Sequence, residues 1–319
     1  MGEPEYWHQR IGNQRDWVWR GWQTRFSFMR AKRSNPINPP IILIHGFGAA
    51  IEHWRKNIPV LSENYTVYAI DLLGFGASRK AAANYSINLW VEQVHDFWQT
   101  FIDTPAILIG NSIGSLIALT AATTYPEMAR GVVMLSLLDL SSSQEMIPKW
   151  LRPIESSLKA IVASSPFIPL IFQLLRRRGT ISNWVKLAYE DRACITEELV
   201  EILAIPPQDR GSTAAFSRLF IGATKTSFGI PAKVLLPKLE IPSLLIWGSR
   251  DRVIPPRIGK MNLAEKLASF NPQIDLILLD RVGHCPHDEC PDRFNAIILD
   301  WLEKNFKNDP KPELDSYYS

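Results

Sequence analysis

The residue in this sequence best suited to covalent chemistry is Ser112, at the centre of a Gly-x-Ser-x-Gly pattern over residues 110–114. A strand-like apolar run, residues 106–109, precedes the pattern, and a helix-like run begins at Ser115. A serine on a sharp turn between strand and helix has its hydroxyl pushed out above the sheet edge, and small neighbours prevent a clash. This context predicts a nucleophile; the alternative is a tight turn with a solvated serine.

A serine nucleophile needs a base to take its proton and an acid to orient that base. His284 follows the predicted strand over residues 274–279, and Asp251 lies in the turn that leaves the predicted strand over residues 244–247. We expect His284 to take the proton from Ser112. Asp251 would then hold the imidazole in the required tautomer and stabilise its charged form.

Other residues compete for these two roles. His287 lies three positions after His284 and is an alternative base. Asp139, which follows the predicted strand ending near Leu135, is an alternative acid, whereas we expect Asp280 to cap its own strand. The sequence favours His284 and Asp251 without excluding His287 and Asp139.

The loop after the first buried strand, His-Gly-Phe-Gly at residues 45–48, predicts an oxyanion hole. Its small residues let the backbone bend so that an N–H group faces the site, and the residue after the nucleophile supplies the second donor. We assign the donors to the main-chain N–H groups of Phe47 and Ile113, each worth about 3 kcal/mol. His45 is expected to bond this loop. Five residues are candidates for substrate contact: Gly46, Asn111, Trp150, Phe167 and Phe172.

The elements that must position these groups alternate between apolar strands and helices. An aromatic, alternating run over residues 18–28 predicts an antiparallel edge strand or hairpin, and residues 87–101 have helical periodicity. Further strands are expected at residues 41–44, 66–71, 107–109, 132–135, 244–247 and 274–279. The pattern predicts an α/β fold with a mostly parallel central sheet flanked by helices.

The domain organisation expected is one catalytic core with an insertion. Residues 140–237 are predicted to form several helices broken by proline, and the strand pattern resumes after them. We therefore expect a helical cap at 140–237, inserted into a core formed by residues 1–139 and 238–307. Residues 308–319 are expected to be a flexible tail.

Composition restricts the function class. With 319 residues, 46% apolar and 21% charged, the chain can bury a large core, and a formal charge of +3 without a basic stripe argues against nucleic acid. Three cysteines without a Cys-x-x-Cys pair indicate a reducing compartment, and Cys285 and Cys290 are interpreted as packing thiols. Neither a signal peptide nor a membrane-spanning run is visible, and no metal or cofactor is expected. We therefore predict an intracellular protein.

The cap sequence bears on the kind of substrate. Residues 147–175 are rich in apolar side chains, interrupted by Pro166 and Pro169, and residues 176–178 are three arginines. Apolar side chains could enter a lipid interface while the arginines contact anionic head groups. The same residues could instead pack the cap onto the sheet, with the arginines at a solvated helix end, and the sequence leaves both interpretations open.

Four motifs, at residues 45–48, 71–76, 110–114 and 283–288, together resemble the α/β-hydrolase superfamily. Within it, the chain is similar to the chlorophyll dephytylase and pheophytinase group of photosynthetic organisms. The resemblance implies hydrolysis of the phytyl ester of chlorophyll a or pheophytin a through an acyl-enzyme, giving the dephytylated pigment and phytol. It also implies a protein that is soluble or peripheral to the thylakoid membrane.

Other functions stay open for this sequence. A general carboxylesterase or acylglycerol lipase would use the same triad on another hydrophobic ester, and a pigment binder on a hydrolase scaffold would not use it at all. A serine at the nucleophile position argues against haloalkane dehalogenase or epoxide hydrolase chemistry, for which this fold uses an aspartate.

Overall fold

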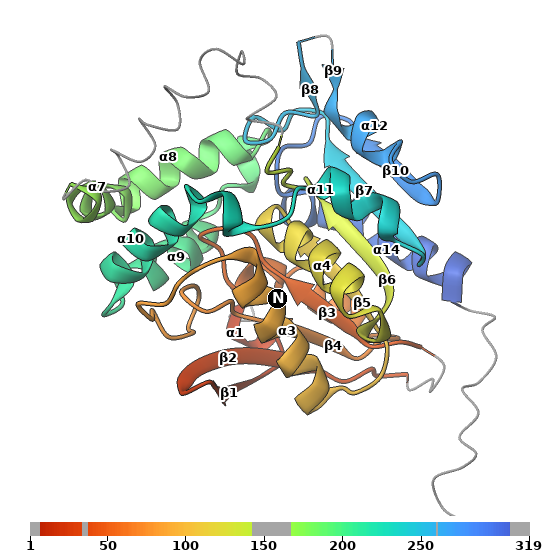
Figure 1. The fold of residues 1–319 in the computed structure, drawn as a ribbon, viewed down its shortest axis with the longest axis horizontal. Coiled ribbons are helices and arrows are strands. Elements are labelled where there is room, and N and C mark those ends of the chain that lie inside the picture. Colours follow the sequence, from red (N-terminus) through yellow and green to blue (C-terminus); the bar gives the residue numbers. More distant parts are fainter. Residues whose placement is uncertain (1–6, 34–37, 142–166, 260, 307–319) are drawn as a thin grey trace, which may run out of the picture.

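The computed structural model describes residues 7–33, 38–141, 167–259 and 261–306, and is built around a sheet with helices on both faces (Figure 1). The sheet has eight strands in the order β1-β2-β4-β3-β5-β6-β7-β10. The strands are β1 (Asn13–Trp19), β2 (Trp22–Met29), β3 (Ile41–Ile44), β4 (Val67–Ile70), β5 (Ala106–Asn111), β6 (Ala129–Leu135), β7 (Ser243–Gly248) and β10 (Ile274–Leu279). A separate hairpin pairs β8 (Arg257–Ile258) with β9 (Met261–Asn262).

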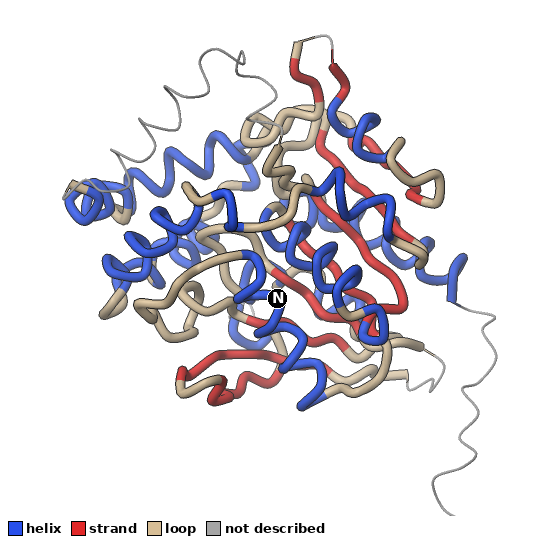
Figure 2. Tube along the Cα trace, in the orientation of Figure 1, coloured by secondary structure: helices blue, strands red, loops and turns tan. Residues whose placement is uncertain are grey.

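Many of the helices flank this sheet, and a separate group of helices lies to one side of it (Figure 2). They are α1 (Trp7–Arg10), α2 (Ile58–Leu61), α3 (Ile87–Phe101), α4 (Ile113–Thr124), α7 (Ile168–Leu175), α8 (Arg178–Ala188), α9 (Glu197–Ala204), α10 (Ser212–Ala223), α11 (Ala232–Leu235), α12 (Leu263–Ala268), α13 (Pro286–Glu289) and α14 (Pro291–Phe306). Short 3-10 turns include η1 (Ile51–Trp54). None of the helices among the described residues has the length and apolar character needed to cross a bilayer.

The predicted fold class is confirmed. Strands β4, β3, β5, β6, β7 and β10 pair in parallel, whereas β1 pairs antiparallel with β2 and β2 pairs antiparallel with β4. Parallel neighbours require crossover helices, and these cover both faces of the sheet, so the inner strands are apolar over most of their length. The edge hairpin turns at Arg20 and Gly21, with φ of 50° and 82°, as a two-residue β-turn requires.

Strand β3 shows how an unbroken apolar run serves two cores. Ile42 and Ile44 face the core that contains residues of α3, α4 and α11, while Ile41 and Leu43 face the core that contains residues of α2 and α14. Successive side chains of a strand point to opposite faces, so each neighbour joins a different core. Buried strands of this kind fix the edge from which the chemical groups project.

The cap region lies between β6 and β7. Helices α7, α8, α9 and α10 stand together at the upper left of Figure 1, beside the ends of the strands that precede the predicted site residues. The division into a core of 1–139 and 238–307 with a cap of 140–237 stays a prediction, and we keep the name cap for residues 140–237. Residues 142–166 and the predicted tail lie outside the described residues.

Candidate active site

Ser112 occupies a strained turn between β5 and α4. Its φ is 57° and its ψ is −116°, a conformation that costs a non-glycine residue about 1–3 kcal/mol. The two glycines of the motif are required because a side chain at either position would collide with the neighbouring backbone. A Cβ on Gly110 would lie 2.2 Å from the carbonyl oxygen of Gly114, and one on Gly114 would lie 2.4 Å from that of Ile44. The pattern Gly-x-Ser-x-Gly is thus what lets the turn pack against β3.

The structure places Asp251 against His284. Nδ1 of His284 lies 2.8 Å from Oδ2 of Asp251, and the two side chains are 8% and 0% exposed. The other oxygen of Asp251 accepts 2.8 Å hydrogen bonds from the N–H groups of Val253 and Ile254, which fixes the carboxylate. A carboxylate partner assigns the proton to Nδ1, so Nε2 of the neutral ring keeps its lone pair.

Asn111, the residue before Ser112, connects the serine turn to the histidine loop. The side-chain amide of Asn111 donates a 3.1 Å hydrogen bond to the main-chain carbonyl of His284. Among the described residues, however, no hydrogen bond joins the Ser112 hydroxyl to the His284 ring. Catalytic hydrogen bonds often tighten only when substrate is bound. The complete triad therefore stays a prediction, with its Asp251–His284 half in hydrogen-bonding contact.

The predicted oxyanion loop lies beside the serine. A Cβ on Gly46 would lie 2.9 Å from Oδ1 of Asn111 and 3.6 Å from Cβ of Ser112. Within the described part of the chain, neither the N–H group of Phe47 nor that of Ile113 has a hydrogen-bond acceptor. The assignment of these two N–H groups to an oxyanion hole stays a prediction.

His45 holds the backbone of this loop. Its Nδ1 lies 2.7 Å from the carbonyl oxygen of Gly46, and its Nε2 accepts a 3.1 Å hydrogen bond from the N–H of Leu72. Burial lowers the pKa of His45 to about 4, so its ring is neutral at pH 7. The adjacent Asp71 accepts hydrogen bonds from two main-chain N–H groups, and burial raises its pKa to about 8.

The alternative acids and base have other partners. Asp139 is buried and accepts hydrogen bonds from Ser141 and from the N–H of Ala232. Asp280 is exposed, and its nearest hydrogen-bond donor is Ser249, at 3.4 Å. His287 is fully buried, and its Nε2 lies 3.3 Å from Nδ1 of His53.

The candidate substrate residues of the cap are spread over its surface and interior. Phe172 is 7% exposed and stacks on Phe216 with ring centroids 4.6 Å apart, whereas Phe167 is 62% exposed. Trp150 lies outside the described residues. Gly46 and Asn111 line the serine as described above, and the assignment of all five residues to substrate contact stays a prediction.

Sequence reasoning missed two residues that support the loop carrying His284, one in the cap and one on α13. The hydroxyl of Tyr189, which follows α8 in the cap, donates to Asp288. Glu289, on α13, accepts a hydrogen bond from the N–H of Gly283, the residue before His284. Tyr189 and Asp288, like Glu190 and Glu289, are 99 positions apart in the chain, so no local pattern pairs them. One signal was present: Asp288 and Glu289 stand in a segment that must pack against the sheet, and buried carboxylates need partners.

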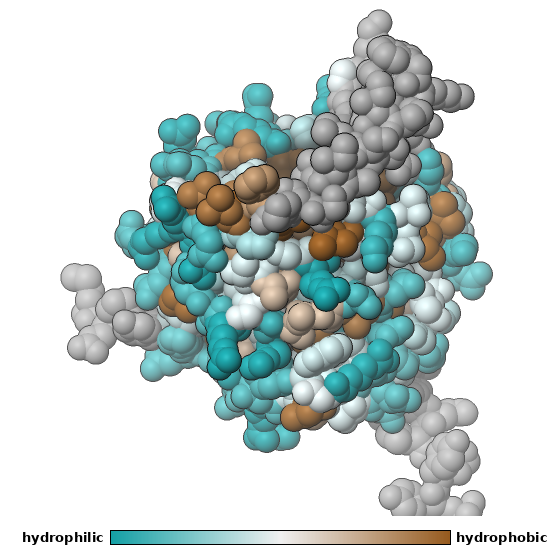
Figure 3. Space-filling view, turned by 60° about the vertical axis from the view of Figure 1, so that its left-hand side comes forward, coloured by the Kyte–Doolittle hydropathy of each residue, from teal (hydrophilic) through white to brown (hydrophobic). Residues whose placement is uncertain are grey.

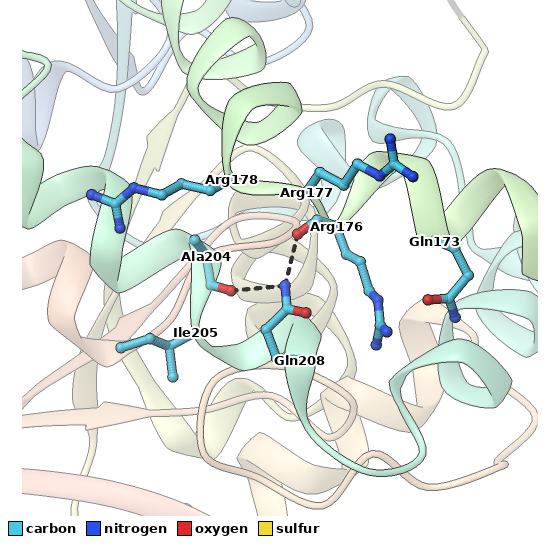
Figure 4. A pocket seen from close by; sticks show the side chains of 7 residues that line it. All are labelled: Gln173, Arg176, Arg177, Arg178, Ala204, Ile205 and Gln208. Atoms are coloured by element: carbon cyan, nitrogen blue, oxygen red, sulfur yellow. Dashed lines mark hydrogen bonds between the residues drawn. The ribbon is translucent and has the colours of Figure 1, made fainter.

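A hollow of about 630 Å³ opens in the cap, where α7 meets α8 (Figure 4). It is lined by Gln173, Arg176, Arg177, Arg178, Ala204, Ile205 and Gln208. The side-chain amide of Gln208 donates to the carbonyl oxygens of Arg176 and Ala204, which ties the two walls together. None of the lining residues belongs to the site around Ser112.

Several known proteins resemble the chain at moderate identity. It is 30% identical over 275 residues to the magnesium-chelatase 30 kDa subunit of Rhodobacter capsulatus, covering 83% of this chain and 87% of that one. It is 23% identical over 318 residues to the chloroplastic pheophytinase of Arabidopsis thaliana, covering 88% of this chain and 64% of the relative, so it spans less than two thirds of that protein. It is 25% identical over 315 residues to human monoacylglycerol lipase ABHD6, covering 97% and 88%.

Solved structures support the fold. The chain matches a serine hydrolase involved in carbazole degradation with a TM-score of 0.73 and 21% identity, over 92% of this chain and 99% of that one. The model of the alpha/beta hydrolase family matches residues 41–297, which include the serine motif and the Asp251–His284 pair. Because the family model matches most of its length and its mostly parallel sheet agrees with that fold, this chain belongs to the alpha/beta hydrolase family.

Proposed function

We propose that this hydrolase cleaves esters with Ser112 as nucleophile, His284 as base and Asp251 as the acid that orients His284. One observation carries the proposal: the 2.8 Å contact between Asp251 and His284, whose main-chain carbonyl accepts a hydrogen bond from Asn111, the residue before the strained serine. Asp251 leaves Nε2 as the basic nitrogen of the ring, and that nitrogen is the one a serine hydroxyl would need.

The reaction would proceed in two halves. Nε2 of His284 takes the proton as the Ser112 oxygen attacks the ester carbonyl, and the N–H groups of Phe47 and Ile113 stabilise the negative oxygen. The C–O bond to the alcohol then breaks, and the imidazolium returns its proton to the leaving oxygen. In the second half, His284 activates a water molecule that cleaves the acyl-serine ester and releases the acid.

For the substrate we propose the phytyl ester of a chlorophyll-type pigment, with chlorophyll a and pheophytin a as candidates. The similarity to pheophytinase supports this choice, because it extends over 88% of the chain. The leaving alcohol would be phytol, and the acid product the dephytylated pigment. An acylglycerol is the second candidate substrate, supported by the similarity to monoacylglycerol lipase over 97% of the chain.

The test is a direct comparison of substrates. The purified protein is incubated in detergent with chlorophyll a, pheophytin a, a monoacylglycerol and a p-nitrophenyl ester, with Ser112→Ala as control, and the products are separated by chromatography. We expect dephytylated pigment with the wild-type protein and none with Ser112→Ala. Hydrolysis of the other esters without any dephytylation would favour a lipase or general esterase function over the pigment function. Turnover that persists in Ser112→Ala would contradict the assignment of Ser112 as the nucleophile.

We propose in addition that the cap rests on a membrane surface that contains anionic lipid. Ile168 and Phe172 turn one side of α7 inward, while Leu170, Ile171 and Leu174 on its other side are 60%, 45% and 48% exposed. A helix that is apolar on its solvent side has a surface of the kind that binds lipid or protein. Figure 3, which brings the cap side forward, shows apolar patches among polar ones on this face.

Positive charge lies next to these apolar side chains. Arg176 and Arg177 follow α7 directly and have no carboxylate partner among the described residues, whereas Arg178 pairs with Glu197. In Figure 4 the three side chains spread in different directions from the junction of α7 and α8. Arginines beside an apolar face suit a bilayer with anionic head groups, and the proposal commits to that partner.

A further inference from the structure

We infer that residues 188–191 of the cap, together with Glu289, position the loop that carries His284. The inference deepens the proposed function, because it assigns these residues a task at the same site. They do not touch the reacting atoms, so they are positioning residues. Four sets of contacts support it: those of Glu289, those of Ala188, a buried chain of polar side chains, and the salt bridges of Glu198.

Glu289 joins the cap to the histidine loop through one carboxylate. Its Oε2 accepts a 2.8 Å hydrogen bond from the N–H of Gly283, the residue before His284. Its Oε1 accepts hydrogen bonds of 3.0 and 2.9 Å from the N–H groups of Glu190 and Asp191. The residue is 7% exposed, so these three bonds are shielded from water and each is strengthened by the charge of the acceptor.

The main chain makes a second connection. The N–H of His284 donates a 2.6 Å hydrogen bond to the carbonyl oxygen of Ala188, the last residue of α8. The two segments are in such close contact that a Cβ on Gly283 would lie 2.3 Å from the same oxygen. His284 is therefore held on one side by Asp251 of the core and on the other by the end of a cap helix.

A buried series of hydrogen-bonded side chains holds the hydroxyl of Tyr189 in place. The hydroxyl of Tyr189 lies 2.7 Å from Oδ2 of Asp288 and 2.8 Å from Nε2 of His53. Since the carboxylate of Asp288 only accepts, the Tyr189 hydroxyl donates to it, and the hydroxyl oxygen then accepts from Nε2 of His53. Nδ1 of His53 is left as an acceptor, and Nε2 of His287 donates to it. The order leaves Nδ1 of His287 as an acceptor, and that atom indeed has no partner among the described residues.

The negative charge of Asp288 decides which group donates in each of these hydrogen bonds. Nη1 of Arg55 and Nζ of Lys56 lie 2.9 and 3.2 Å from its Oδ1. Burial alone would raise the pKa of Asp288, but these neighbouring charges and the Tyr189 hydroxyl lower it overall, so the carboxylate is ionised.

Arg55 also ties the cap to the core directly. Its Nε donates a 2.5 Å hydrogen bond to Glu198 on α9, and Arg10 pairs with the same carboxylate. Tyr189 also packs with Val185, Leu199 and Cys285 in a small apolar cluster between cap and histidine loop. The cap and the histidine loop are thus joined by hydrogen bonds, ion pairs and apolar contact at one place.

The consequence is a coupling between the outer surface of the cap and the base. Helix α8 begins at the arginine segment, exposes Trp184 to 58%, and ends at the carbonyl that binds the N–H of His284. A displacement of α8 shifts that carbonyl, and a misplacement of about 1 Å is enough to cost about 10²-fold in rate.

The test uses two conservative variants of the full chain. Glu289→Gln keeps the shape but turns an NH₂ group toward one set of main-chain N–H donors, and Tyr189→Phe removes only the hydroxyl. We expect kcat for p-nitrophenyl butyrate to fall about 10- to 100-fold in Glu289→Gln with KM changed less than about threefold, since positioning affects the chemical step. We expect a smaller fall of the same kind in Tyr189→Phe. Glu63→Gln, whose carboxylate pairs with Lys32 on the surface, and Tyr68→Phe make the same chemical changes elsewhere and should leave kcat unchanged.

A second readout does not depend on activity. Backbone hydrogen exchange should accelerate in Glu289→Gln at both segments, 188–191 and 283–285, because one carboxylate protects both. Wild-type kcat in both variants, or faster exchange in only one of the two segments, overturns the inference. If Glu289→Gln does not fold, Tyr189→Phe decides alone, with the same two readouts. Failure of the proposed function is recognised separately, by ester turnover that persists in Ser112→Ala.

Discussion

The side-chain amide of Asn111 donates a 3.1 Å hydrogen bond to the main-chain carbonyl of His284, across 173 positions of sequence. The residue before the serine thereby touches the histidine loop. Through this contact the end of β5 and the loop after β10 are held as one unit, although two other strands lie between them in the sheet. The proposed general base catalysis by His284 requires a fixed arrangement of this kind.

The proposed role of Asp251 predicts the effect of Asp251→Asn. The amide keeps the shape of the side chain, but its NH₂ group favours the wrong tautomer of His284 or loses one of the main-chain bonds. We expect kcat for ester hydrolysis to fall about 10⁴-fold, with KM much less affected. Steady-state kinetics on a p-nitrophenyl ester measures both constants. A loss of less than tenfold would favour Asp139 as the acid, which Asp139→Asn would then reveal.

The packing of the serine turn predicts opposite effects for two glycine substitutions. A Cβ in Gly114→Ala would lie 2.4 Å from the carbonyl oxygen of Ile44, whereas one on Gly179 in α8 would meet nothing within 4 Å. We expect Gly114→Ala to lower the free energy of unfolding by about 1–3 kcal/mol and to reduce activity. Gly179→Ala should raise the free energy of unfolding by up to about 1 kcal/mol. Urea unfolding of both variants gives the comparison, and equal stabilities would contradict it.

The buried histidines predict a loss of stability in acid. Burial lowers the pKa of His53 to about 4, below the ordinary value near 6.5. Between these two pH values the unfolded chain binds a proton that the folded chain does not, so the free energy of unfolding decreases as the pH falls. The contribution of His53 is about 1.4 kcal/mol per pH unit.

This pH effect is measured by comparison with His53→Gln, which cannot bind the proton. Urea unfolding at pH 7, 6 and 5 should show that any stability advantage of the wild type shrinks as the pH falls through this window. A difference between the two proteins that is constant with pH would mean that His53 is already charged in the folded state.

The proposed membrane contact predicts binding to lipid vesicles. Replacing Leu170 and Leu174 by serine should weaken co-sedimentation with anionic vesicles at least tenfold, because burying one leucine contributes about 1.5–3 kcal/mol. Val18→Ser is the matched control, since Val18 is 69% exposed on β1. Arg177→Gln should weaken binding to anionic vesicles only, by about 1 kcal/mol. Equal effects of Val18→Ser and the cap variants would exclude a specific cap surface.

Much of the core was predictable from local pattern. Residues 41–44, 87–101 and 274–279 were expected to form elements and have the bounds of β3, α3 and β10. Continuous apolar runs mark buried parallel strands, and the start of α3 is fixed locally because Ser86 accepts a hydrogen bond from the N–H of Leu89. The serine, histidine and aspartate were predicted in the same way, since each lies at or shortly after the end of a strand.

The support of the site could not be predicted. Tyr189 and Glu289 depend on pairing between segments about 100 positions apart, which no periodicity encodes. The short hairpin of β8 and β9 was also missed, because two-residue strands leave no repeating pattern. Local sequence specifies strands and turns, whereas a buried polar network is decided by how the completed elements meet.

The most direct test of the account is to map the covalent adduct of a fluorophosphonate by mass spectrometry. This reagent reacts with a serine that is activated as a nucleophile and leaves a stable adduct on it. We predict a single adduct on the peptide that contains Ser112, absent in Ser112→Ala and formed at least about 10³-fold more slowly in His284→Ala. An adduct on another residue, or an unchanged labelling rate in His284→Ala, would contradict the assignment of nucleophile and base.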